Sequence, residues 1–368
     1  MTTSAPIAQA ADRLLALPYE TWAFGDSVGF EALLAATPAT GDSRYAAFAH
    51  GFFRAWATRA EPYRPLDCTA PGLAMTLGAE QTGDARLLDA AARLADYLAG
   101  RRLVGGVFAT WERSPLRHPY GPGSLPPDEA ALLRDPGAGV FVDCLHFDPP
   151  FFAALGRVAG EPGFIRLAIE QAVGYVQLLQ DPTGGLFHHF WLEKTERPYI
   201  LGWGRGQGWA LLGLLDVLEQ QGWRADADPG DGLAMLADAA HRLADAMRGV
   251  QRPDGHWWAV VQDPQSGNET STAAFMAVAF ARGRALGLLG DDYREPEARA
   301  LAAIRAATNV NGVLTGVSAA VWACTSPNHY AHVPRGFLVP WGQGPLVLAL
   351  ARAESAAALA PEIVPAGG

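Results

Sequence analysis

The sequence predicts an all-α protein built from repeated helical hairpins. Apolar residues recur at helical spacing, with alanine between them, in stretches such as 86–100, 164–180 and 233–250, whereas strand-like alternation is scarce. A weak internal repeat supports hairpins, because the segments 40–56 and 82–98 both place a T-G-D turn before an amphipathic helix. The repeated unit therefore measures about 40 to 60 residues, and roughly six such units fill the chain.

The turns between these helices carry capping signals. In the T-G-D turns the glycine, Gly41 or Gly83, suits the position just after a helix, and the Asp or Ser that follows can cap the next one. Looser copies of the unit lie at 160–176 and 290–304. Because no polar low-complexity segment interrupts the series, we expect a single domain over residues 1–368.

The content of the connections favours a closed toroid over an open solenoid. Most of the 11 tryptophans lie between helical stretches, among them Trp22, Trp203 and Trp209. A toroid gathers alternate connections at one mouth, where aromatic rings can line a sugar-sized cleft. A solenoid of the HEAT or TPR type would not concentrate tryptophan and glycine in its loops. We therefore expect these tryptophans to contact a sugar.

Charge and composition exclude several classes of partner. The formal net charge is −10 and no run of Lys or Arg occurs, which argues against nucleic acid or an anionic membrane as a partner. The first residues lack a signal-peptide pattern, and no apolar run reaches the roughly 18 residues of a membrane span. Cys68, Cys144 and Cys324 stand far apart without C-x-x-C spacing. We expect a cytoplasmic protein, whose acidic ligand would need a local basic pocket.

Two aspartates are candidates for catalysis. Asp143 lies in the stretch 139–152, which otherwise predicts a buried helix, and a carboxyl group among apolar neighbours suits a general acid. Asp67 stands just before the proline-containing helix start of the segment 65–80. Each has an alternative role as a helix cap. On separate hairpins, the two carboxyl groups could also meet across a toroid and share acid and base work.

The segment LGWGRGQGW, residues 201–209, has the most unusual composition of the chain. Its glycines let the backbone approach a ligand, Trp203 and Trp209 offer flat faces for a sugar ring, and Arg205 offers a fork that matches a carboxylate. The alternative is a glycine-rich turn in which Arg205 pairs with a structural acid. The segment lacks the phosphate-binding pattern G-x-x-x-x-G-K-[ST].

The remaining polar candidates are histidines and helix-capping residues. His188 and His189 lie in an extended segment, so their side chains point to opposite sides and only one can meet a ligand. Neither this pair nor His329 and His332 has the spacing of a zinc site, so no metal is expected. Glu269 stands at the start of a long helix, where its carboxylate either caps that helix or contacts a ligand.

Six segments, in this order, resemble blocks of the unsaturated glycuronyl hydrolases, glycoside hydrolase families 88 and 105, and most of all the unsaturated rhamnogalacturonyl hydrolases. They are LDCTAPGLAMTLGAEQTGDARLLDAA, FVDCLHFDPPFFAALGRVAG, GGLFHHFW, GWGRGQGWALLGLLDVLE, QRPDGHWWAVVQDPQSGNETSTAAFMAVAFARG and GQGPLVLALA. The likeness runs from about residue 20 to 352. It implies an (α/α)6 barrel, in which Asp143 is the catalytic acid/base and Asp67 the second acidic residue of the site. It further implies that His189, Trp203 and Arg205 bind substrate.

The resemblance also implies a reaction that needs no cofactor. The substrate is an oligosaccharide whose non-reducing end carries a 4,5-unsaturated uronyl residue left by a polysaccharide lyase. The acid protonates the enol ether at C4, and water then adds at C5. The resulting hemiketal opens and releases the aglycone sugar, so one carboxyl group serves as acid and then as base.

Three departures from the family pattern leave other activities open. Phe141 stands where the family often has tryptophan, and the segment 112–138 is an insertion where a shorter one with a His-Lys pair is expected; Arg117 and His118 are possible stand-ins for that pair. The run VPRGFLVPWGQG replaces an acidic-His-Gly run. The alternatives are hydrolysis of a saturated uronoside, sugar epimerisation, or sugar binding without catalysis. Epimerases of this fold need paired histidines, so substitution of His189 alone would separate epimerisation from hydration.

Overall fold

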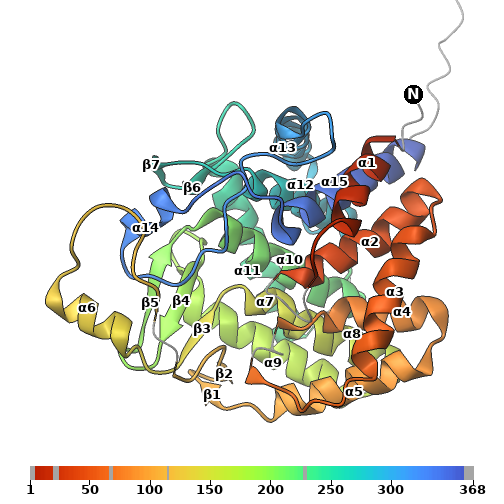
Figure 1. Ribbon diagram of the computed structural model, residues 1–368, viewed down its shortest axis with the longest axis horizontal. Coiled ribbons are helices and arrows are strands. Elements are labelled where there is room, and N and C mark those ends of the chain that lie inside the picture. The colour runs from red at the N-terminus through yellow and green to blue at the C-terminus, as the bar shows by residue number, and fades with distance from the viewer. Residues whose placement is uncertain (1–4, 20–24, 66–68, 114–115, 227–229, 360–368) are drawn as a thin grey trace, which may run out of the picture.

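Six helices form a closed inner ring. The computed structural model describes residues 5–19, 25–65, 69–113, 116–226 and 230–359. The inner helices are α2 (Asp26–Thr40), α4 (Gly72–Thr82), α8 (Pro149–Ala159), α10 (Gly204–Gln220), α12 (Ser271–Ala285) and α15 (Pro340–Leu359). Each contacts the next in this order, and α15 contacts α2, so the last inner helix closes the ring on the first (Figure 1). Helices α10 and α12 bury every residue from 204 to 218 and from 271 to 280, as expected for helices that are covered on all sides.

Six further helices cover this ring from outside. They are α1 (Ala5–Leu15), α3 (Arg44–Ala57), α5 (Ala85–Ala99), α9 (Pro162–Leu179), α11 (Asp231–Gly249) and α13 (Arg294–Ala307). Five of them lie across two neighbouring inner helices, and α11 packs against the inner helix α10 and the outer helix α9. The outer helix α5, for example, buries Leu87, Leu94 and Leu98 on one face. This architecture is the (α/α)6 barrel that the sequence analysis predicted.

The turn chemistry read from the sequence is also found. Gly41 and Gly83 end α2 and α4 with φ of 73° and 67°, a left-handed conformation that glycine adopts without strain. The Asp84 carboxylate accepts a hydrogen bond from the backbone N–H of Arg86 and caps α5. Local sequence therefore determines these hairpin connections.

Three small antiparallel sheets lie at one end of the barrel. They are β1 (Leu103–Val104) with β2 (Val107–Phe108), β3 (Gly139–Phe141) with β4 (His188–Leu192) and β5 (Arg197–Leu201), and β6 (Trp258–Val260) with β7 (Asp263–Asn268). The short helices α6 (Pro127–Arg134) and α14 (Pro327–His332) lie at the left edge in Figure 1, and α7 (Cys144–Phe147) lies nearer the centre, against α10 and α8. None of the helices in the described ranges is both long and apolar enough to cross a membrane.

The stretch 139–152 differs from its predicted helix. Residues 139–141 form strand β3, paired with β4 so that Phe141 lies opposite Phe190. A four-residue helix, α7, and the start of α8 at Pro149 follow. Pairing with a strand some fifty residues later overrides the local helical spacing, which is a tertiary effect that periodicity does not report.

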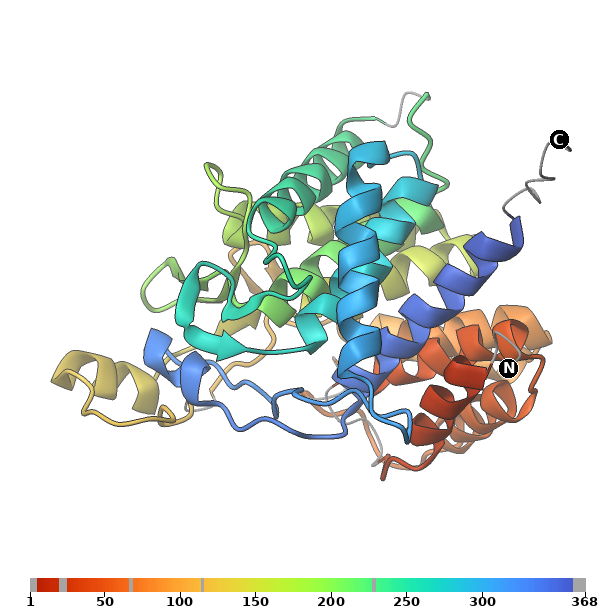
Figure 2. The same cartoon turned by 90° about the horizontal axis from the view of Figure 1, so that it is seen from above.

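The segment 112–138 packs against the segment 316–333 near the end of the chain. It contains α6, and the Glu129 carboxylate accepts a hydrogen bond from Thr325 Oγ1 at 3.0 Å. The ring of Tyr120 stacks on that of His329, with centroids 5.3 Å apart, and its backbone N–H donates to His329 Nδ1 at 3.0 Å. Both views show α6 beside α14 at the edge of the molecule (Figure 2).

Candidate active site

Asp143 lies at the junction of β3 and α7, and its carboxylate does not cap a helix. The residue occupies the position before α7, but its side chain makes no capping hydrogen bond. Only 2% of its surface is exposed, and neither carboxylate oxygen accepts a hydrogen bond from the described residues. A buried polar group without such partners is uncommon in proteins and is frequent at functional sites.

His189 is the nearest polar neighbour of this carboxylate. It lies on β4. The pairing of β3 with β4 continues one residue beyond β3, because Val142 N–H donates to the His189 carbonyl at 2.8 Å. Its Nε2 is 3.6 Å from Asp143 Oδ2, and its Nδ1 is 2.5 Å from the hydroxyl of Tyr330. The sheet and helix α14 thus place a tyrosine, a histidine and an aspartate in one line.

The ionisation of these groups indicates which nitrogen of His189 carries the proton. Burial lowers the pKa of His189, although Asp143 opposes this effect, and burial raises the pKa of Tyr330 well above its usual range. A neutral imidazole that accepts the tyrosine O–H at Nδ1 carries its own proton on Nε2. Nε2–H therefore faces the carboxylate of Asp143.

Aromatic rings fix the imidazole of His189 from several sides. Phe141 stacks on it with centroids 5.2 Å apart, and Trp203 lies at 4.2 Å, tilted by 47°. Tyr330 meets it edge-on at 5.5 Å. Trp203 immediately precedes α10 and is 3% exposed, so it packs against the imidazole in this structure.

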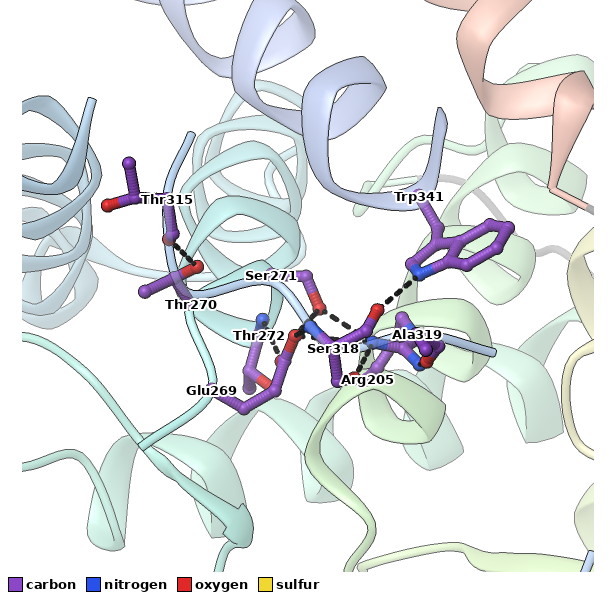
Figure 3. A network of polar contacts seen from close by, with 9 residues as sticks. All are labelled: Arg205, Glu269, Thr270, Ser271, Thr272, Thr315, Ser318, Ala319 and Trp341. Carbon is purple, nitrogen blue, oxygen red and sulfur yellow. Dashed lines mark hydrogen bonds and ion pairs between the residues drawn. The ribbon is translucent and has the colours of Figure 1, made fainter. Parts of the chain in front are cut away.

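Arg205 lies in the first turn of α10 and makes an ion pair with Glu269 (Figure 3). Its Nη1 is 3.2 Å from Glu269 Oε1 and donates to Ser318 Oγ at 2.8 Å, while Nη2 donates to the carbonyl of Ala319 at 3.1 Å. Burial lowers the pKa of Arg205, and Glu269 and Asp143 act in the opposite direction. The pairing with an acid is the alternative that the sequence left open, and a contact of Arg205 with substrate remains a prediction.

Glu269 connects this ion pair to the start of α12. Its carboxylate accepts hydrogen bonds from Ser271 Oγ at 2.7 Å, from Ser318 N–H at 3.0 Å and from Thr272 N–H at 3.3 Å (Figure 3). Glu269 thus both supports the first turn of α12 and balances the charge of Arg205. Ser318 was not identified from the sequence, because it lies in a long connection without a recognisable motif.

The other predicted site residues have different locations. Trp209 is fully buried on α10, where its ring packs against His146 at 5.2 Å and Phe275 at 4.6 Å, and its contact with a sugar remains a prediction. His188 points away from His189, with Nδ1 3.1 Å from the carbonyl oxygen of Leu179, as alternation along a strand requires. Asp67 and Trp22 lie outside the described residues.

A second buried polar group was not predicted from the sequence. His146 Nε2 is 3.3 Å from Glu31 and Nδ1 is 3.2 Å from Asp216, which also pairs with Arg282. Burial opposes the positive charge of His146, but Glu31 and Asp216 together raise its pKa to about 10. Three such side chains can in principle hold a metal ion. In this structure His146 bridges the two carboxylates and Arg282 compensates Asp216, so the contacts among these residues describe a buried ionic cluster.

A closed ring of six helix pairs, together with a buried carboxylate that has aromatic neighbours, fits a carbohydrate-active enzyme of the (α/α)6 type. The chain belongs to Glycosyl Hydrolase Family 88, whose sequence profile matches residues 4–357. It is therefore a glycoside hydrolase, and the resemblance seen in the sequence is confirmed.

Individual relatives agree with this assignment. The chain is 27% identical over 268 residues, 72% of its own length and 69% of the relative's, to the unsaturated rhamnogalacturonyl hydrolase YesR of Bacillus subtilis (strain 168). It has the fold of a possible GH105 member from Klebsiella pneumoniae, with a TM-score of 0.82, 19% identity and coverage of 96% and 93% of the two chains. It also has the fold of the unsaturated glucuronyl hydrolase of Bacillus sp. GL1, with a TM-score of 0.68, 18% identity and 95% coverage of each chain.

Proposed function

We propose that the protein removes a 4,5-unsaturated uronyl residue from the non-reducing end of an oligosaccharide produced by a polysaccharide lyase. The observation that carries this proposal is the buried carboxylate of Asp143, which is 2% exposed and has His189 as its nearest polar neighbour. The similarity to an unsaturated rhamnogalacturonyl hydrolase supports the choice of substrate class. The whole chain acts in this proposal as one catalytic domain.

Asp143 is the acid and base of the reaction. Its carboxyl proton adds to C4 of the enol ether, and the positive charge that develops at C5 is shared with the ring oxygen. The Asp143 carboxylate then takes a proton from a water molecule whose oxygen bonds to C5. The hemiketal opens to a ketone, and the hemiacetal left at C1 releases the aglycone. Asp67 is the second acidic residue of this site.

His189 and Tyr330 position the catalytic carboxyl group. The hydroxyl of Tyr330, 2.5 Å from Nδ1, holds the proton of His189 on Nε2, which faces Asp143 at 3.6 Å. In this arrangement Nε2–H stabilises the carboxylate that is left after proton transfer, without competing for the proton itself. The contact is long for a hydrogen bond, as is common for catalytic groups before substrate binds.

Substrate binding involves the side of the site formed by α10. Trp203 provides an aromatic face, and Arg205 has an Nε without a hydrogen-bond acceptor among the described residues. We retain Trp209 and Trp22 as further candidates for sugar contact. The insertion 112–138 stands beside α14, which carries Tyr330, and we propose that it forms a wall for the aglycone.

The proposed reaction takes place in the cytoplasm. Cys144 and Cys324 are buried free thiols, which fits a reducing compartment. The partner is the unsaturated oligosaccharide, without nucleic acid or membrane. We predict no cofactor, because proton transfer and hydration need only the carboxyl group and water.

A panel of unsaturated disaccharides tests this function. Polysaccharide lyases acting on different polymers supply the panel, and hydration removes the near-ultraviolet absorbance of the conjugated enol ether. We expect loss of absorbance with at least one member, together with release of the aglycone sugar. If no member reacts, the protein acts on a different uronoside.

A further inference from the structure

The cluster of Arg205 and Glu269 carries no net charge, which leaves an anionic sugar without a cation at this position. The two side chains are 0% and 3% exposed, and their charges compensate at 3.2 Å. A protein with a net charge of −10 repels an anionic substrate at long range. A cation in excess at the site would offset this repulsion.

Arg335 is a basic side chain that adjoins this cluster. It pairs across an antiparallel bridge with Ser318, whose hydroxyl accepts the hydrogen bond from Arg205. Ala319 N–H donates to the carbonyl of Pro334 at 2.9 Å and Gly336 N–H to that of Val317 at 2.8 Å. These bonds flank Ser318 and Arg335 and make them a non-hydrogen-bonded pair, in which the two side chains stand close together on one face.

The guanidinium of Arg335 has no ion-pair partner within the described part of the chain. Its Nη2 donates to the carbonyl of Ser266 at 2.5 Å, and its Nε is buried without an acceptor. Burial lowers the pKa of Arg335, and Glu269 opposes this effect, so the guanidinium senses the same carboxylate as Arg205. Arg205, Glu269 and Arg335 together therefore carry one positive charge in excess.

The backbone of β7 is shaped to hold this side chain. Gly267 has φ of +73°, and a Cβ atom there would lie 2.7 Å from Nη1 of Arg335. Any other residue would strain the backbone and displace the guanidinium. Helix α14, which carries Tyr330, packs against β6 and β7, so this arginine is held next to the elements that support His189.

We propose that Arg335 supplies the positive charge that binds an anionic group of the substrate, a carboxylate or a sulfate. The inference rests on the proposed function and adds the residue that recognises the charge. The group belongs either to the unsaturated uronyl ring or to the aglycone, and the same guanidinium chemistry suits both. Arg205 is then primarily the ion-pair partner of Glu269, and its Nε stays a candidate for substrate contact.

Binding measured without turnover tests this role. Calorimetry measures the affinity of three probes for two proteins, one with Asp143→Asn alone and one with Asp143→Asn and Arg335→Gln. The first is an unsaturated disaccharide with a neutral aglycone, the second its methyl ester, and the third the same disaccharide with a sulfated aglycone. We expect Arg335→Gln to weaken binding of an anionic probe by about 10- to 100-fold, and Arg335→Lys to recover part of it. Ester binding should change by less than about twofold if the ring carboxylate is the group that is read.

Arg252→Gln is the matched control. Arg252 contacts Asn268 on β7, the strand that also holds Arg335, but it already pairs with Asp254. Its replacement by Gln removes the same positive charge from the protein as Arg335→Gln does. We expect it to change binding by less than about twofold. If Arg335→Gln weakens binding of the first probe, Arg335 binds the ring carboxylate. If it weakens binding of the third probe alone, Arg335 binds the sulfate of the aglycone.

Two results would overturn the proposal. One is an equal loss on all three probes, which would mean that Arg335 only holds β7 in place, and the other is no loss on any of them. Binding of galacturonic acid and of its methyl ester tests the anion site independently of the reaction, because neither compound can be hydrated. If wild type hydrates no disaccharide but Arg335→Gln still weakens only the acid, the reaction is wrongly assigned and the anion site stands.

Discussion

Removal of the Arg205 guanidinium tests whether this residue is primarily a partner of Glu269. In Arg205→Met, the carboxylate of Glu269 stays buried, with 3% exposure, but loses its counter-charge. Breaking such a pair costs about 3–5 kcal/mol of unfolding free energy. Ser271 Oγ and Ser318 N–H still donate to the carboxylate, so we expect a loss of about 3 kcal/mol, at the low end of this range.

The matched double variant separates a lost charge from lost packing. Arg205→Met combined with Glu269→Gln has neither charge, and we expect it to recover at least about half of the lost stability. Urea denaturation followed by tryptophan fluorescence measures both variants. A loss below about 1 kcal/mol in Arg205→Met, or no recovery in the double variant, would refute the ion pair as the main role of this residue.

Activity measured with an acid substrate and its ester resolves the remaining role of Arg205. Arg205→Ala should lower kcat/KM by roughly two to three orders of magnitude, and Arg205→Lys should recover only part, because lysine lacks the fork. If the guanidinium also binds the carboxylate, wild type and Arg205→Ala should act on the ester about equally poorly. Equal effects on acid and ester would leave Arg205 as a structural residue.

Three further predictions concern neighbouring groups. Folding raises the pKa of His146 to about 10, so the native state binds more protons than the unfolded state. The unfolding free energy should therefore fall as the pH rises from about 6.5 to 10. His146→Gln should flatten this fall, and an unchanged curve of unfolding free energy against pH would contradict the prediction. Tyr330→Phe should lower kcat about tenfold with little change in KM, because the tautomer of His189 is no longer fixed. The pH dependence of kcat should shift as well. An unchanged pH dependence would mean that Tyr330 does not position His189. Replacing 112–138 by a short Gly-Ser turn should alter which aglycones are accepted, and unchanged selectivity over the disaccharide panel would make the insertion a surface feature.

Local signals in the sequence were sufficient for the helical hairpins and their turns. Gly41 and Gly83 end helices because only glycine adopts the required φ without strain, and such signals act within a few residues. Closure of the ring by contact between α15 and α2 joins the ends of the chain, and no periodicity reports it. The tryptophan- and glycine-rich connections favoured closure, and the resemblance to a family of known architecture supplied the six-hairpin barrel.

The site was predictable where a motif carries it and not elsewhere. Asp143, His189 and Arg205 lie in unusual segments that attract notice in the sequence. Their partners Tyr330 and Ser318 come from a long connection without a motif, and only the tertiary structure brings them within hydrogen-bonding distance. The strand β3 was read as helix for the same reason, since its partner β4 lies far along the chain.

The rate of hydration by Asp143→Asn tests most directly whether Asp143 supplies the proton. The amide is nearly isosteric with the carboxyl group but can neither donate an acidic proton nor activate water. We predict an unchanged circular dichroism spectrum and loss of absorbance slowed by at least about a thousandfold with the best unsaturated disaccharide. A folded Asp143→Asn protein that keeps more than about a tenth of the wild-type rate would show that another group supplies the proton.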